Sequence, residues 1–119
     1  MQDNLQISLL YDFYGPLLGD NMQQAVELYY NDDLSLSEVA DIMGISRQGV
    51  RDTLSRAVKK LEDFESKLSL LSRFEREQKI LKKIITDADS VFSSTDEKDI
   101  KALAENIKES ASSLYEQEL

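Results

Sequence analysis

This chain of 119 residues lacks several residue types on which common chemistries depend. It has no cysteine and no histidine, which excludes disulfide bonds, thiol catalysis and Ser-His catalysis and removes the usual zinc ligands. An enzyme would therefore depend on carboxylates and lysines alone. The chain also has no apolar run of about 18 residues and no basic segment ahead of an apolar one. We therefore expect no membrane span, no signal peptide and a cytoplasmic protein.

Helix breakers are equally scarce. Pro16 is the only proline, and the four glycines stand at positions 15, 19, 44 and 49. Apolar residues recur at helical spacing between these breakers, which predicts an all-α fold. One helix is expected to run without interruption from Ser46 to about Leu71, and amphipathic helices are expected over 73–92 and 100–114. We therefore expect a helical core over residues 1–71 that ends in a long helix, followed by an amphipathic helical segment over residues 72–119.

Three pairs of residues have the spacing of a capping box, in which a short polar side chain caps a helix and a Glu or Gln three residues later bonds back to it. The pairs are Asp20 with Gln23, Ser35 with Glu38, and Ser94 with Glu97. Helices are therefore expected to begin directly after residues 20, 35 and 94.

The segment SEVADIMGISRQGV, residues 37–50, has the features of a helix-turn-helix. Two short helices that meet at a steep angle need a small residue at their contact and a turn residue that tolerates positive φ. Ala40 and Gly44 supply these, and Ser46 is placed to cap the second helix. The expected apolar interior of the corner consists of Val39, Met43, Ile45, Val50 and Leu54. A helical corner with no binding role is the alternative.

The net charge of −9 disfavours a polyanionic partner, but the charge is unevenly distributed. Residues 1–45 contain eight acidic residues and no basic one, whereas residues 46–60 contain five basic residues and one acidic one. On a DNA-binding helix, Gln48 and Arg51 are placed for base edges and the other basic side chains for phosphates. The candidate nucleic-acid-binding residues are Arg47, Gln48, Arg51, Ser55, Arg56, Lys59 and Lys60. An ordinary solvated helix face is the alternative.

Other features are compatible with more than one role. Gly49 lowers helix propensity and could permit the close approach of a partner. The aromatic side chains of the N-terminal half can stack on bases or can belong to the core or its rim; they are Tyr11, Phe13, Tyr14, Tyr29 and Tyr30.

The C-terminal segment has two such features. A second basic block alternates with acids, which favours a solvated surface over a phosphate track or a protein-docking face; it consists of Arg73, Arg76, Lys79, Lys82 and Lys83. A narrow apolar stripe over residues 100–114 can bury one face only, so a homodimer through the C-terminal helices is a reasonable hypothesis. The acidic pairs lack the remaining ligands of an EF-hand, and no GxxxxGK loop is present, so we expect no metal, no cofactor and no catalytic residue.

Residues 10–68 resemble the YlxM family of bacterial helix-turn-helix proteins. The segments FYGPLL, ELYYNDDLSLSEVA and GISRQGVRD carry the resemblance, which covers about half of the chain. It implies a small cytoplasmic protein whose helix-turn-helix core is winged-helix-like or similar to the promoter-binding region four of sigma factors. Genes of the family characteristically neighbour that of the signal recognition particle protein, which implies a regulatory or accessory role in co-translational targeting.

Three functions are compatible with these observations. The first is a regulatory protein of the signal recognition particle pathway that contacts the RNA or the protein of the particle, with Arg47, Gln48, Arg51, Arg56 and Lys59 as its nucleic-acid contacts. The second is a sigma-like transcriptional regulator that uses the same residues in the major groove of duplex DNA. The third is a helical adaptor that binds only protein, which the net charge favours. None of the three is an enzyme.

Overall fold

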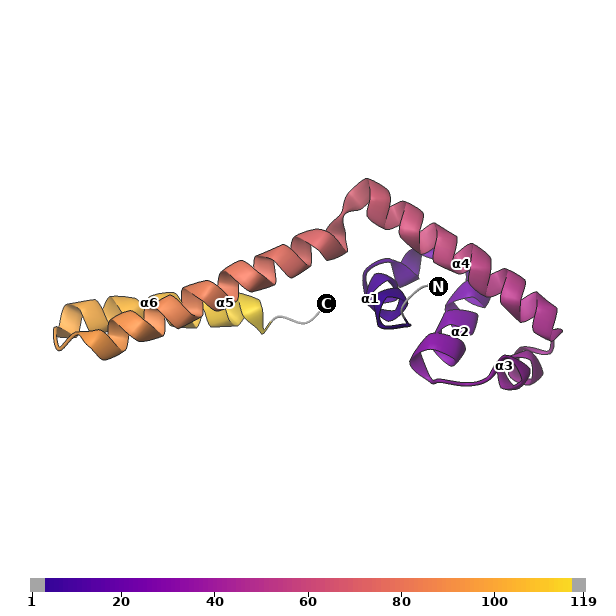
Figure 1. Cartoon of the computed structure of the whole chain (residues 1–119), viewed down its shortest axis with the longest axis horizontal. Coiled ribbons are helices and arrows are strands. Elements are labelled where there is room, and N and C mark those ends of the chain that lie inside the picture. The colour runs from indigo at the N-terminus through magenta and orange to yellow at the C-terminus, as the bar shows by residue number, and fades with distance from the viewer. Residues whose placement is uncertain (1–3, 117–119) are drawn as a thin grey trace. The chain divides into compact units, whose positions relative to one another are not determined.

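A computed structural model describes residues 4–116 (Figure 1). Within this range the chain forms six α-helices and no β-strand, so it is an all-α protein whose helix-turn-helix has no β-hairpin wing there. The helices are α1 (Asn4–Tyr14), α2 (Asp20–Val26), α3 (Leu36–Met43), α4 (Arg47–Leu68), α5 (Leu70–Ser94) and α6 (Lys98–Tyr115). A 3₁₀ turn, η1 (Gly15–Leu17), follows α1, and a π-helical turn, η2 (Glu27–Asn31), follows α2. Among residues 4–116, every helix is too short or too polar to cross a lipid bilayer.

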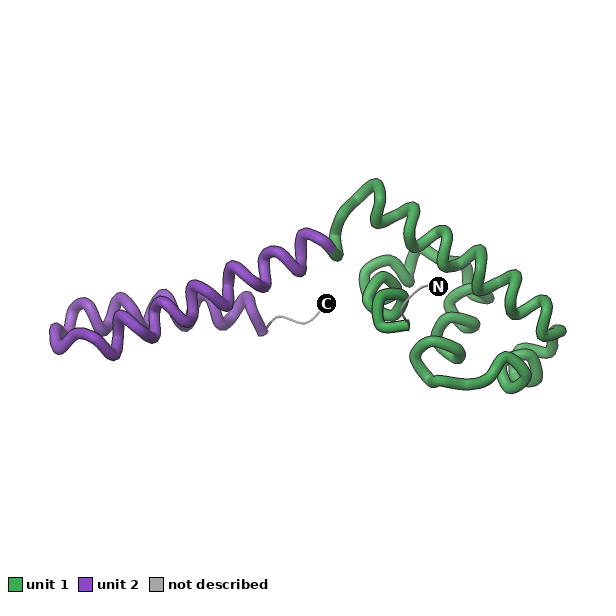
Figure 2. Tube along the Cα trace, in the orientation of Figure 1, with its two compact units in different colours: residues 1–71 green, residues 72–119 purple. Residues whose placement is uncertain are grey.

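The chain forms two compact units, residues 1–71 and residues 72–119 (Figure 2). The first unit contains α1 to α4 and the first two residues of α5. The second contains the rest of α5 and all of α6. The helix-turn-helix, formed by α3 and α4, therefore belongs entirely to the first unit.

The core of the first unit forms against one face of α4, which contacts α1, α2 and α3 (Figure 1). The buried residues Val50, Leu54, Ala57 and Leu61 recur at steps of three and four and so lie on one side of α4. Buried residues from the other elements complete the core, namely Ile7, Leu10, Tyr14, Leu18, Ala25, Val26, Val39, Ala40 and Leu71. Each large apolar side chain buried here contributes roughly 1.5–3 kcal/mol relative to an exposed one, so α4 is the element on which the unit is assembled.

The predicted capping box of α3 is present. Ser35 Oγ accepts a hydrogen bond from the N–H of Glu38 at 3.1 Å, and Glu38 Oε1 accepts one from the N–H of Ser35 at 3.0 Å. Because the backbone N–H and the hydroxyl of Ser35 both stabilise the carboxylate, they hold the pKa of Glu38 below its usual value. The start of α3 is thus fixed locally, by residues within one turn.

The other two predicted capping boxes are wrong. Gly19 is the N-cap of α2, and Asp20 is its first residue. The side-chain amide of Gln23 does not bond to Asp20 but donates to the carbonyl of Leu18 at 2.8 Å. Likewise, α6 begins at Lys98 without a side-chain cap. The serine expected to cap it is the last residue of α5, and the N–H of Glu97 donates to the hydroxyl of Thr95 at 3.2 Å.

The expectation of an unbroken helix from Ser46 to Leu71 is also wrong. The helix α4 ends at Leu68, and Ser69 adopts a left-handed backbone conformation with φ of 55°. No glycine or proline marks this position, and such a conformation costs a non-glycine residue roughly 1–2 kcal/mol. Side-chain contacts must therefore hold the turn.

A partly buried hydrogen-bond network supplies those contacts. The hydroxyl of Tyr14, from α1, donates to Glu65 Oε1 at 2.6 Å and accepts from the N–H of Leu70 at 3.0 Å. Glu65 Oε1 also accepts from the N–H of Leu71 at 3.0 Å. Burial, and then the hydrogen bond to Glu65, raise the pKa of Tyr14, so its hydroxyl stays protonated. Tyr14 and Glu65, which are 51 residues apart in the sequence, thus provide hydrogen-bond partners for the first amides of α5.

The second unit is an antiparallel pair of helices (Figure 1). Near the start of α5, the amide of Gln78 donates to the carbonyl of Tyr115 at the end of α6, at 3.1 Å. Further along, Lys108 Nζ lies 2.9 Å from Asp89 Oδ1. Near the hairpin turn, the ammonium of Lys101 lies 4.8 Å from the ring centroid of Phe92. The only buried residues described in this unit are alanines, at positions 88, 104 and 111.

Candidate nucleic-acid interface

The corner between α3 and α4 has helix-turn-helix geometry. Ala40 is buried at the contact, and Gly44 has φ of 69° and ψ of 32°, in the left-handed region where a side chain is strained. Ser46 Oγ accepts from the N–H of Gly49 at 2.9 Å and caps α4. One expectation for the interior is wrong, because Ile45 is 41% exposed. It lies over the first turn of α4 and does not enter the core.

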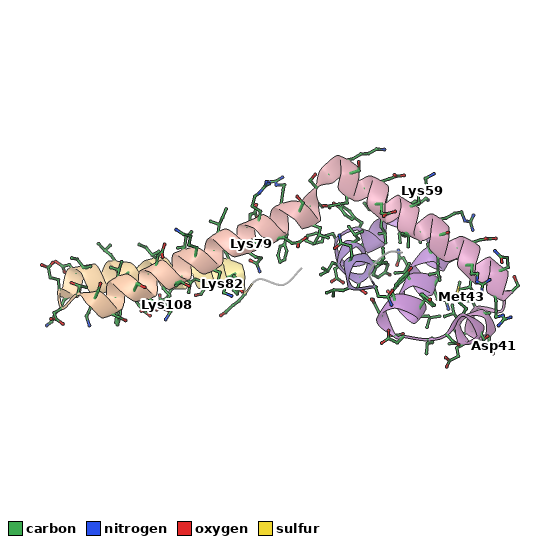
Figure 3. All side chains as sticks on the ribbon, in the orientation of Figure 1. Asp41, Met43, Lys59, Lys79, Lys82 and Lys108 are labelled. Carbon is green, nitrogen blue, oxygen red and sulfur yellow. The ribbon has the colours of Figure 1, made fainter. Side chains whose placement is uncertain are left out.

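The outer face of α4 carries the positive charge of the first unit. Residues 1–45 have no basic residue, so every lysine and arginine of this unit lies on α4. All seven candidate residues are exposed, and Lys59 projects away from the helix axis into solvent (Figure 3). No acidic residue lies in the first turn of α4, where the helix dipole is positive and Arg47 adds to it. This end of α4 therefore attracts anions.

Asp52 lies in the middle of this basic face and holds two of its neighbours. The amide of Gln48 donates to Asp52 Oδ1 at 3.0 Å, and Arg56 Nε donates to the backbone carbonyl of Asp52 at 3.3 Å. Arg47 Nη1 lies 3.4 Å from the hydroxyl of Ser37, which connects the start of α4 to α3.

Three other basic side chains, Arg51, Lys59 and Lys60, make no ion pair within residues 4–116. All three side chains are exposed, so they are accessible to the phosphate groups of a ligand.

Gly49 faces the cap of its own helix. A Cβ at this position would lie 3.2 Å from Ser46 Oγ and 3.5 Å from Ile45 Cδ1. The missing side chain thus makes room for the capping serine and the exposed isoleucine. The close approach of a partner at Gly49 stays a prediction.

A groove lies between α4 and the π-helical turn η2. Its main hollow has a volume of about 580 Å³ and is lined by Asn4, Tyr29, Tyr30, Leu36, Arg51, Leu54, Ser55, Val58, Lys59 and Glu62. A second hollow of about 510 Å³ shares three of these residues, Asn4, Tyr29 and Leu36, and continues to Arg47. We call the two together the tyrosine groove. It joins basic side chains of the candidate face to two half-buried aromatic rings.

Sequence reasoning left the role of the aromatic residues open, and the structure separates them. Tyr14 is buried in the core, and the hydroxyl of Tyr11 donates to Glu27 Oε1 at 2.7 Å. Burial, and then this bond to the Glu27 carboxylate, raise the pKa of Tyr11. Only Tyr29 and Tyr30 line the tyrosine groove. Their place beside α4 depends on the π-helical turn, for which the sequence offered no indication.

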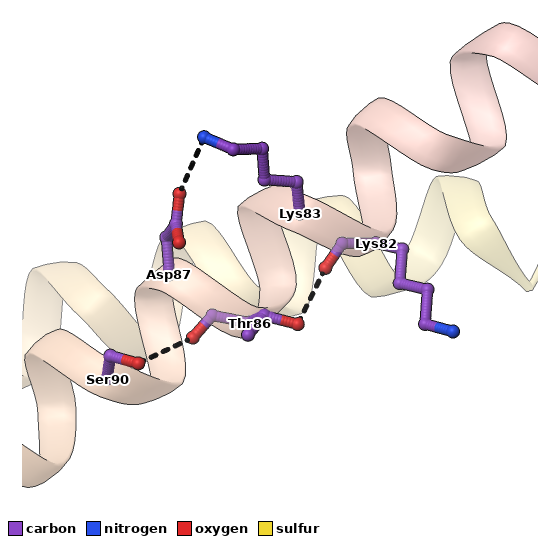
Figure 4. A network of polar contacts seen from close by, with 5 residues as sticks. All are labelled: Lys82, Lys83, Thr86, Asp87 and Ser90. Carbon is purple, nitrogen blue, oxygen red and sulfur yellow. Dashed lines mark hydrogen bonds and ion pairs between the residues drawn. The ribbon is translucent and has the colours of Figure 1, made fainter.

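The second basic block lies on α5, in the second unit, with all five side chains exposed. Lys83 Nζ lies 3.5 Å from Asp87 Oδ2, one turn later (Figure 4). The hydroxyls of Thr86 and Ser90 bond back to the carbonyls of Lys82 and Thr86, at 3.0 and 3.1 Å (Figure 4). These are local contacts within one exposed helix, as expected of a solvated surface. Within residues 4–116, no three acidic side chains are grouped to hold a metal ion.

The family of the chain follows from its sequence relatives. A family profile described as "Putative helix-turn-helix protein, YlxM / p13 like" matches residues 1–105. The chain belongs to this family, UPF0122. The match extends through α5 and into α6, so the α5–α6 pair lies largely within the family's shared region, beyond the motifs that carry the resemblance.

Individual UPF0122 proteins support this assignment. The UPF0122 protein of Thermoanaerobacter sp. strain X514 is 50% identical over 82 residues, which cover 69% of this chain and 70% of that protein. The UPF0122 protein of Desulforamulus reducens is 46% identical over 85 residues, covering 71% and 73%. The UPF0122 protein of Clostridium novyi is 36% identical over 108 residues, covering 91% and 94%. The last of these alignments spans nearly the whole chain.

Proposed function

We propose that this UPF0122 protein binds nucleic acid through the outer face of α4 and acts as an accessory, regulatory protein of the signal recognition particle pathway. The observation that supports nucleic-acid binding best is the charge of α4, which carries every basic residue of the first unit. These side chains follow a helix-turn-helix corner, where the second helix of nucleic-acid-binding proteins makes its contacts.

The RNA of the particle is the partner that we propose, and the distribution of charge favours it over long duplex DNA. The basic residues of the first unit are confined to 47–67, and the 45 residues before the α4 cap carry eight acids. Such a surface repels a polyanion outside one narrow contact. A folded RNA with loops and bulges can offer a narrow contact more readily than a straight duplex can. The link to the particle itself comes from the resemblance to the YlxM family.

The proposal is tested by fluorescence anisotropy of labelled signal recognition particle RNA, titrated with the protein at several salt concentrations. We expect binding that weakens as salt increases, because Lys and Arg displace counterions from phosphates. Reversing two charges on α4, Arg51→Glu with Lys59→Glu, should weaken binding strongly. It should also reduce the slope of log K against log salt by about 1 for each phosphate that the variant no longer binds.

The matched control reverses two exposed lysines of the second unit, Lys79→Glu with Lys82→Glu, which changes the net charge by the same amount. This variant should retain most of the affinity. Equal losses in the two variants would mean that binding follows total charge and not the face of α4. Absence of binding by the unaltered protein at low salt would contradict nucleic-acid binding and favour a partner that is a protein.

The second candidate function is that of a sigma-like regulator of transcription, and the side chain of Gln48 favours it. Gln48 is exposed in the first turn of α4, where such a helix meets base edges in the major groove, and a glutamine amide can pair with adenine. Its bond to Asp52 keeps the amide oriented across the face of the helix. Tighter binding to one duplex sequence than to the RNA of the particle, lost in Gln48→Ala, would favour this function.

We also propose that the protein self-associates through its C-terminal helices. One face of the α5–α6 pair carries exposed apolar side chains, which we call the C-terminal seam: Ile80, Ile84, Val91, Ile100, Leu103, Ile107 and Leu114. An apolar hollow of about 310 Å³ lies within it and is lined by both helices. On α6 the spacing of these residues follows the heptad of a coiled coil. A second copy of the pair would bury the seam and complete a four-helix bundle.

A further inference from the structure

The tyrosine groove combines aromatic rings with basic side chains, the two features by which proteins bind single-stranded nucleic acid. Two aromatic rings, Tyr29 and Tyr30 of η2, line its main hollow together with Leu54 and Val58 of α4. The ammonium of Lys59 and the guanidinium of Arg51 come from the same stretch of α4. At about 580 Å³ the main hollow falls in the range of roughly 300–1,000 Å³ that small-molecule sites occupy.

The two rings are held in place by each other and by the backbone. They meet edge to face, with centroids 5.0 Å apart and planes at 87°. The backbone beneath them is the π-helical turn η2, closed by the N–H of Asp32 on the carbonyl of Glu27 at 2.9 Å. Single π turns of this kind occur frequently at functional sites. Burial raises the pKa of Tyr30, so its hydroxyl is neutral and can donate.

We propose that the tyrosine groove binds the base of an unpaired nucleotide in the RNA partner. The base stacks on the ring of Tyr30, and Arg51 and Lys59 bind the phosphates that flank it. The proposal rests on the proposed function, because the same two basic residues are used. It adds a base-binding site beside α4, in which the two tyrosines come from η2, outside the helix-turn-helix. It also specifies that the RNA element bound is an unpaired nucleotide.

A recess favours an unpaired nucleotide over a duplex. The bases of a duplex are stacked inside it, and only its grooves and phosphates are accessible, so a protein surface must project into the duplex. Half-buried aromatic rings that line a hollow can stack on a base that has left its helix, and RNA loops and bulges supply such bases. Stacking on an aromatic side chain stabilises the complex with any base. Glu62 also lines the hollow, and its carboxylate disfavours a phosphate chain that continues along α4 past Lys59.

The test compares two RNA duplexes, each made of two separate strands with blunt ends. One duplex is fully paired, and the other has one additional, unpaired nucleotide in the middle of one strand. Anisotropy titrations should show tighter binding of the second RNA. Tyr30→Ala should weaken that binding by about tenfold and leave binding of the fully paired duplex unaffected, since a stacked base is lost. Tyr30→Phe keeps the ring and should retain the affinity within about twofold. Tyr115→Ala, which removes a half-exposed tyrosine of α6, is the matched control and should have no effect.

The outcomes separate this inference from the function on which it rests. Equal affinity of the unaltered protein for both RNAs, or an equal loss for both in Tyr30→Ala, would overturn the groove but leave nucleic-acid binding by α4 intact. Absence of binding to either RNA would overturn both.

A measurement on the unaltered protein covers the case in which Tyr30→Ala does not fold. With 2-aminopurine as the unpaired base, stacking on Tyr30 should quench its fluorescence on binding. A complex that forms without quenching would contradict the proposal.

Discussion

Tyr14 shows how one hydroxyl group can decide where a helix ends. Its ring is fully buried in the core of the first unit, and its hydroxyl donates to Glu65 and accepts from the N–H of Leu70. The left-handed conformation of Ser69 is unfavourable for its residue type, so the turn exists because these bonds compensate for it. The identity of residue 14 therefore controls the backbone at residue 69.

Replacing Tyr14 by Phe should lower the free energy of unfolding by roughly 1–3 kcal/mol, because the N–H of Leu70 and the carboxylate of Glu65 each lose a partner. Urea unfolding followed by far-UV circular dichroism measures the change. Tyr29→Phe removes a hydroxyl that has no hydrogen-bond partner among the described residues, and it should change stability by no more than about 0.5 kcal/mol. Equal stability of the two variants would show that the network does not hold the turn.

Residue-scale features were predictable from sequence where the interaction is local. The bonds between Ser35 and Glu38 span one turn, and the spacing of these residues in the sequence predicted them correctly. The same spacing failed at Asp20, because Gln23 bonds to Leu18 outside the helix instead. The network of Tyr14 spans more than fifty residues, so no local pattern could indicate it.

At the scale of elements, the spacing of the apolar residues predicted that α5 and α6 are amphipathic. It did not predict which apolar residues would be buried between the two helices and which would stay exposed. The buried contacts of the pair are made by alanines, and larger side chains such as Leu103 and Ile107 remain exposed. A helix with an apolar face still exposed after pairing is typical of an element that pairs again. Likewise, the tyrosine groove depends on a π turn, whose hydrogen bonds leave no periodic trace in a sequence.

The proposed self-association predicts that the protein sediments as a dimer at micromolar concentration. Two lysines introduced into the C-terminal seam, Leu103→Lys with Ile107→Lys, should give a monomer, because burying two unpaired charges in an apolar interface is strongly unfavourable. Sedimentation equilibrium measures the mass directly.

The control introduces two lysines on α6 outside the seam, Ala102→Lys with Ser113→Lys, where both residues are exposed. This variant should remain a dimer. An unaltered protein that sediments as a monomer over the whole concentration range would contradict the proposal.

At the scale of the whole molecule, an acidic chain carries its basic residues in two short segments. The net charge is −9, yet the basic residues concentrate on α4 and on the first half of α5. Sequence alone predicted this segregation, because each basic block is a continuous stretch of sequence within one helix. It could not show that Arg51 and Lys59 share a groove with two tyrosines, since that contact joins α4 to a turn distant in sequence.

The bonds that begin α5 have a consequence for how the chain opens to solvent. The first amides of a helix usually lack partners and exchange their hydrogens with water quickly. Those of Leu70 and Leu71 are instead bonded to the hydroxyl of Tyr14 and the carboxylate of Glu65, in partly buried positions. In native-state deuterium exchange they should be retained as long as the core amides of α1 and α4, while the uncapped amides at the start of α6 exchange early. Exchange at Leu70 and Leu71, the first two residues of α5, would then measure the unfolding of the first unit.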